Sequence, residues 1–227
     1  MQSLKEEISI VSVSRSTYLK KLQDNDFLWC ANIKADWDSI HKDCEALAEN
    51  NQDHWRPDMG EDYTPWDEAG VKFKKYWDSF GDYGLAPSNK FQGYNKHNTR
   101  HWESTANKPT LTSPWMDEVM EQLPLTHKGC RIMMQPPGNT MPWHVDNFWN
   151  LRHNHPDIGE YAIRYIVFPK DWDHGHLLQA GTTFITHWKA GDVIVWHPDK
   201  WHLSANVGIS NKWTFNVTGI LTEEVTE

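Results

Sequence analysis

Histidine is concentrated in one stretch of this chain of 227 residues, which contains 13 histidines in all. Eight of the 13 lie between positions 144 and 202, and such a cluster indicates metal binding, proton transfer or both. His144 and Asp146 form the first candidate pair. Residues i and i+2 of an extended segment point to the same side, so this imidazole and this carboxylate can share one metal ion.

The His-x-Asp pattern has little weight alone, because three other pairs match it. His41 and Asp43 lie on a predicted helix, His155 and Asp157 lie in a polar loop, and His197 and Asp199 lie in a turn. Only His144 follows a predicted strand and turn and precedes a strand-rich region that ends in an isolated histidine, His202. Two imidazoles and one carboxylate with three open positions form the facial triad of non-haem Fe(II) oxygenases. A closed zinc site would require a fourth ligand.

A lysine follows this candidate triad in the sequence. Lys212 lies ten residues after His202, at the start of the predicted strand 213–221. It can bind the far carboxylate of a dicarboxylate cosubstrate whose 2-oxo acid end chelates the metal. A buried ammonium without such a partner would be costly.

Arg164 and Tyr165 are the alternative residues for binding the cosubstrate. Both lie in the predicted strand 161–168, where an arginine among apolar residues is unusual. An inward Arg164 can bind a carboxylate of the cosubstrate or substrate in place of Lys212 or alongside it. An outward Arg164 leaves the inward face to Tyr165, because adjacent residues of a strand cannot both point inward without a bulge.

The elements that position these residues are mainly short strands. Helices are predicted at 36–50 and 114–123, a turn at 136–139, and strands at 130–135, 161–168, 182–188, 192–196 and 213–221. Helices come first, strands follow, and no β-α-β alternation occurs. This order favours an antiparallel β-sandwich or barrel with helices packed on one side.

Taken in order, these motifs resemble the 2-oxoglutarate/Fe(II)-dependent dioxygenase superfamily. The resemblance covers about residues 128–221 and rests on Met134-Gln135-Pro136-Pro137-Gly138, His144-x-Asp146, Gly191-Asp192, His202 and Lys212. Prolyl 4-hydroxylase-like members have a lysine ten residues after the distal histidine. The pattern over 191–202 is also similar to aspartyl/asparaginyl hydroxylases, which lack the metal carboxylate that Asp146 supplies here, so the subfamily stays open.

The resemblance implies a mainly β fold with flanking helices, in which a double-stranded β-helix (jelly roll, cupin-like) forms the core. Residues 128–227 would form this catalytic core, and residues 1–127 a helical and loop-rich support region packed on it. His144, Asp146 and His202 would bind Fe(II), and Lys212 would bind the C5 carboxylate of 2-oxoglutarate. The implied reaction is hydroxylation of a C–H bond in a peptidyl residue or small molecule, with consumption of O2 and release of succinate and CO2.

Two other classes of function share this architecture. Residues 191–206 resemble the second cupin motif, and His174-Gly175-His176 resembles the His-x-His of the first. The glutamate expected a few residues later is absent, since Leu-Leu-Gln-Ala follows at 177–180. The other class is a non-catalytic jelly-roll binding domain, against which the intact set of ligand residues argues.

Composition narrows the range of partners and compartments. The net charge of −9 disfavours a broad nucleic-acid-binding surface, and no apolar run is long enough to span a membrane. The first residues lack the apolar segment of a secretory signal. Three scattered cysteines predict free thiols in a reducing compartment. A cytoplasmic enzyme with a small-molecule or peptidyl substrate is therefore expected.

Overall fold

Two antiparallel sheets dominate the computed structural model, which describes residues 12–30, 32–50, 100–104, 113–146 and 148–226. The larger sheet has the strand order β2 (Leu28–Trp29), β9 (Val193–Val195), β6 (Ala162–Val167), β11 (Lys212–Leu221), β4 (Leu125–Gln135) and β3 (Arg100–Ser104). The smaller sheet has the order β5 (Asn139–His144), β10 (His202–Asn206), β7 (His176–Ala180) and β8 (Thr183–Ile185). Because every pair of neighbours is antiparallel, the two sheets form the predicted jelly-roll core.

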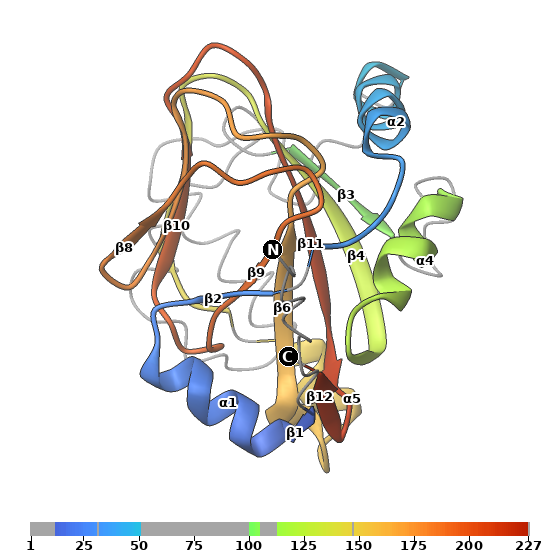
Figure 1. Cartoon of the computed structure of the whole chain (residues 1–227), viewed down its shortest axis with the longest axis vertical. Coiled ribbons are helices and arrows are strands. Elements are labelled where there is room, and N and C mark those ends of the chain that lie inside the picture. Colours follow the sequence, from blue (N-terminus) through green and yellow to red (C-terminus); the bar gives the residue numbers. More distant parts are fainter. Residues whose placement is uncertain (1–11, 31, 51–99, 105–112, 147, 227) are drawn as a thin grey trace, which may run out of the picture.

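Helices cover the outer face of the larger sheet. Helices α2 (Trp37–Asn50) and α4 (Pro114–Glu121) lie on the side away from β10 and β8, whereas α1 (Arg15–Asp24) lies beside a small sheet of β1 (Ser12–Ser14) and β12 (Glu224–Thr226) (Figure 1). Trp115 of α4 stacks on Phe215 of β11 with ring centroids 4.9 Å apart. The predicted helices are confirmed, although α4 ends at Glu121 rather than at residue 123.

Strand alternation divides the larger sheet into an outer apolar face and an inner mixed face. In β11, Trp213, Phe215 and Val217 are buried in the cluster under the helices. The alternate residues, beginning with Lys212, therefore face the smaller sheet. A second apolar cluster fills part of the space between the sheets and includes Phe168, whose ring stacks on Trp188 at a centroid distance of 4.2 Å.

The predicted strands are mostly confirmed, but one of them is shorter than expected, and several strands were not predicted, including β5 and β10, which carry the candidate histidines. The strand expected over 182–188 stops at Ile185, and His187 adopts a left-handed backbone with φ of 60°, which a strand does not accommodate. Strand β7 was not predicted, because its leading Asp-His-Gly-His sequence is typical of a loop. The region expected to support the core also contributes strands to it, since β2 pairs with β9 and β3 pairs with β4.

Within the described ranges, no helix is both long enough and apolar enough to cross a lipid bilayer.

Candidate metal centre

The two candidate histidines meet where β5 ends and β10 begins. His144 is the last residue of β5, His202 is the first of β10, and the two are directly paired across these antiparallel strands. Both side chains are buried, and their ring centroids lie 4.1 Å apart. Trp196 packs against the His202 ring at a centroid distance of 4.5 Å. Strand pairing therefore brings together two imidazoles that are 58 residues apart in the sequence.

Asp146 completes this group. Its Oδ2 lies 3.8 Å from Nε2 of His202, and the ligand atoms of Asp146, His144 and His202 all lie within 4.8 Å of one another. Metal bonds to imidazole nitrogen and carboxylate oxygen are about 2.1 Å long, so ligand atoms at adjacent positions around one ion lie about 3 Å apart. The three ligand atoms are therefore close enough to share an ion after side-chain movements of up to about 1 Å.

His202 is held in the form that binds a metal. Its Nδ1 lies 2.9 Å from the carbonyl oxygen of Lys200, which can only accept a hydrogen bond. Nδ1 therefore carries the proton, and Nε2, which faces Asp146, keeps its lone pair. Burial lowers the pKa of His202 despite the nearby Asp146 carboxylate, so the neutral ring predominates at neutral pH.

The two carboxylate oxygens of Asp146 have different surroundings. The Arg164 Nη1 donates to Oδ1 at 2.5 Å, and the Arg164 Nε donates to Thr218 Oγ1 at 2.9 Å. Burial opposes ionisation of Asp146, but Arg164 and the two histidines outweigh it and lower the pKa of the carboxyl. The other oxygen, Oδ2, is buried and accepts no hydrogen bond from any residue that the structure describes. A buried acceptor left unpaired is costly, and a cation between Oδ2 and the imidazoles would satisfy it. The donor set thus fits a divalent metal.

Lys212 lies in a second polar group inside the core. Its side chain is only 2% exposed, and Nζ donates to Leu177 O at 2.7 Å, Ser204 Oγ at 2.5 Å and Gln135 Oε1 at 3.2 Å. All three acceptors are neutral, and burial holds the pKa of Lys212 well below its usual value of 10.5. An anion beside this ammonium would stabilise the charged form.

The strand β10 links the metal group to this lysine. Ser204 follows His202 by two residues, so both side chains project from the same face of β10, with backbone positions about 7 Å apart. The Ser204 hydroxyl also donates to Gln135 at 2.5 Å. The His202 imidazole and the hydroxyl that binds the Lys212 ammonium thus lie on the same face of β10.

The two alternative cosubstrate residues point in opposite directions, as strand alternation requires. Arg164 faces inward but binds Asp146, whereas the Lys212 ammonium has other partners. The Tyr165 hydroxyl donates to the Tyr18 hydroxyl at 3.4 Å, and its ring lies in the cluster beneath the helices. The structure therefore brings Arg164 to the metal group and leaves Tyr165 on the outer face.

Other histidines considered as ligands, within the described ranges, make different contacts. His176 is buried and its Nε2 lies 3.0 Å from Ser210 O, whereas His174 is exposed. His197 makes a contact of 3.9 Å with Asp199 in a turn. Across the part of the chain that the structure describes, His144, Asp146 and His202 are the only three metal-binding side chains that converge.

Solved structures with the same fold have very different sequences. A prolyl-4-hydroxylase from Pseudomonas putida matches with a TM-score of 0.51 at 11% identity, covering 91% of this chain and 98% of its own. The non-heme alpha ketoglutarate dependent carbocyclase SnoK from nogalamycin biosynthesis matches with a TM-score of 0.52 at 9% identity, covering 92% and 86%. No family model matches the chain, and the search of curated proteins found no match. At such identities the likeness shows the fold, a double-stranded β-helix.

Several residues that contact Lys212 or Arg164 could not be assigned a role from the sequence. Gln135 and Ser204 lie within quoted motifs, yet only the folded strands place them against Lys212. Thr218 is found beside Arg164 because the two residues are paired across β11 and β6. Cross-strand pairing was the missing information in each case.

Proposed function

We propose that this chain is an Fe(II)- and 2-oxoglutarate-dependent oxygenase that hydroxylates a C–H bond of a small molecule or a peptidyl residue. The observation that carries the proposal is the buried Oδ2 of Asp146, which lies beside the two histidines and accepts no hydrogen bond from the described part of the chain. His144, Asp146 and His202 would hold the iron at three positions and leave three open for the cosubstrates. When bound, iron with 2-oxoglutarate and O2 supplies the oxidising power to break an unactivated C–H bond, releasing succinate and CO2.

The protein's own residues bind and orient these groups. The Lys200 carbonyl fixes the His202 tautomer, and Arg164 occupies Oδ1 of Asp146, which leaves Oδ2 for the metal. Lys212, with Ser204 beside it, would bind the distal carboxylate of 2-oxoglutarate. That carboxylate would supply the counter-charge that the buried ammonium lacks among its three neutral acceptors.

Anaerobic titration of the metal-free protein with Fe(II) and 2-oxoglutarate tests the proposal. We expect the weak visible charge-transfer band of a 2-oxo acid chelated to iron, and we expect His202→Ala to abolish it. Lys212→Ala should retain iron but weaken 2-oxoglutarate binding, and unchanged cosubstrate affinity would transfer that role to Arg164. Metal binding without the band in the wild type would contradict the proposal and favour a cupin-type enzyme that does not use 2-oxoglutarate.

A further inference from the structure

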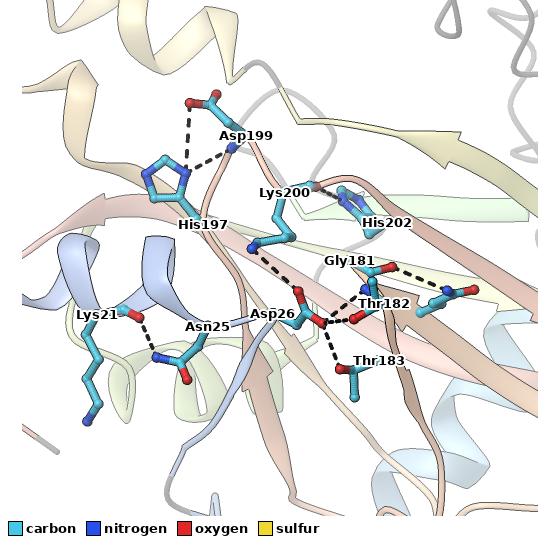
Figure 2. Close-up of polar contacts among 11 residues, drawn as sticks. Lys21, Asn25, Asp26, Gly181, Thr182, Thr183, His197, Asp199, Lys200 and His202 are labelled. Atoms are coloured by element: carbon cyan, nitrogen blue, oxygen red, sulfur yellow. Dashed lines mark hydrogen bonds and ion pairs between the residues drawn. The ribbon is translucent and has the colours of Figure 1, made fainter.

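Asp26 lies in the connection between α1 and β2, far in the sequence from every candidate ligand. Its Oδ2 accepts hydrogen bonds from the Thr182 backbone N at 3.0 Å, Thr182 Oγ1 at 2.9 Å and Thr183 Oγ1 at 2.7 Å. Its Oδ1 lies 3.6 Å from the Lys200 Nζ. One carboxylate therefore joins two separate segments, as Figure 2 shows.

Both of these segments adjoin His202. On one side, Ala180 pairs with His202 across β7 and β10, and the backbone N of Gly181 donates to Trp201 O at 2.8 Å. On the other side, the carbonyl oxygen of Lys200 accepts the hydrogen bond from His202 Nδ1 (Figure 2). Asp26 thus restrains the β7–β8 turn and the residue that fixes the imidazole.

The carboxylate fits closely into this position. Gly181 has a φ of +54°, and a Cβ added there would lie 2.0 Å from Asp26 Oδ1. The Asp26 side chain is 26% exposed, so most of it is covered. Hydrogen bonding, first of all from Thr183, lowers the pKa of Asp26 against the opposing effect of burial. The side chain is therefore an anion at neutral pH, and Lys200 is attracted to it.

We infer that Asp26 is a positioning residue for the metal-binding histidine, acting through Lys200 and the 181–183 turn. Asp26 holds the Lys200 carbonyl in position to accept the hydrogen bond from Nδ1–H of His202. This hydrogen bond orients the imidazole so that its Nε2 faces Asp146. The inference rests on the proposed function, since it requires that His202 bind a metal. Partners of this kind, one step beyond the ligand, typically change metal affinity by about 10–100-fold when they are lost.

Cobalt(II) titration of the full chain tests this role, because cobalt reports its ligand geometry through visible absorption. Asp26→Asn keeps the shape of the side chain but removes its charge. We expect it to weaken cobalt binding by about 10-fold and to change the absorption spectrum at saturating cobalt. Asp171→Asn is the matched control, because Asp171 also accepts from a backbone N, that of Ala190, and pairs with a lysine, Lys189. It should leave cobalt affinity and spectrum unchanged.

The outcomes separate this inference from the proposed function. A wild-type chain that binds no cobalt would overturn the proposed metal site itself. A wild-type chain that binds cobalt, with Asp26→Asn matching it in affinity and spectrum, would overturn only the positioning role. If Asp26→Asn does not fold, Lys200→Met keeps the backbone carbonyl and removes the ion pair. A several-fold loss of cobalt affinity in Lys200→Met would then support the role, and wild-type affinity would overturn it.

Discussion

Lys212 carries its ammonium into the core without an anionic partner among its three hydrogen-bond acceptors. Replacing it by methionine should raise the free energy of unfolding by about 1 kcal/mol near pH 7, because the buried charge is removed while Ser204 and Gln135 still bond each other. The same variant should lose 2-oxoglutarate binding. Urea unfolding followed by tryptophan fluorescence measures the first effect, and cosubstrate titration measures the second.

The pH dependence of this difference follows from the lowered pKa of Lys212. Between the folded-state pKa and the usual value of 10.5, the unfolded chain binds more protons than the folded protein. The free energy of unfolding of the wild type should therefore rise with pH up to 10.5, and the stability advantage of Lys212→Met should become smaller. A stability difference that stays constant or grows as the pH rises toward 10.5 would contradict a desolvated ammonium.

Arg164 and Asp146 form an ion pair of low exposure, with 16% and 10% of the side chains accessible. Arg164→Met should destabilise the metal-free protein by about 3 kcal/mol, because it leaves the Asp146 carboxylate buried without its strongest partner. Added metal should restore much of this loss, since the ion supplies the missing charge. Urea unfolding with chelator and with excess Co(II) measures both quantities.

Lys189→Met provides the matched control for this variant. Lys189 forms a pair of 2.9 Å with Asp171, but 72% of its side chain is exposed. Its loss should cost less than about 1 kcal/mol with or without metal. Equal losses in the two variants would mean that burial of the Arg164 pair has no energetic effect.

Among the elements, the start of β7 depends on a glycine. Gly175 has a φ of +87°, and a Cβ there would lie 2.2 Å from the backbone N of Gly208. Gly175→Ala should cost about 3 kcal/mol or more, because backbone cannot move aside as a flexible side chain can. Gly138 has a φ of +80° but open space around it, so Gly138→Ala should cost only about 1 kcal/mol. Thermal unfolding of both variants checks the difference, and similar losses would contradict the close approach at Gly208.

Element prediction succeeded where a local pattern exists. The apolar segments around β6, β9 and β11 are bounded by turn residues, so these strands are visible in the sequence. The His-x-Asp spacing likewise implies a shared direction for two side chains. In contrast, Asp26 contacts Thr182, which is 156 residues away, and no local pattern marks such a pairing. Strand alternation left the inward and outward orientations of Arg164 open, and its pairing with Asp146 depends on where the β5 end lies. The roles of the site residues stay predictions until ligand binding is measured.

For the whole molecule, metal and cosubstrate binding should be linked to folding. The site needs β5 and β10 paired, so ligands that bind only the folded chain stabilise it by mass action. At about 100 times the dissociation constant, one ligand adds about 2.7 kcal/mol. A protein of this size should then gain about 5–10 °C in Tm. Differential scanning calorimetry with Co(II) and 2-oxoglutarate measures the shift, and a shift that persists in His202→Ala would place the ligands elsewhere.

The pairing of β1 with β12 joins two strands that are synthesised at very different times during translation. β1 is synthesised early, and its partner strand Glu224–Thr226 emerges much later. In the same way, β2 cannot pair until β9 has been synthesised, and Asp26 cannot contact Lys200 until that residue has been added. On the ribosome, α1 and its flanking strands therefore remain without these partners until β9 and β12 have been made. Closure of the β-helix is thus expected to follow the synthesis of β11, and the proposed metal site should form only then.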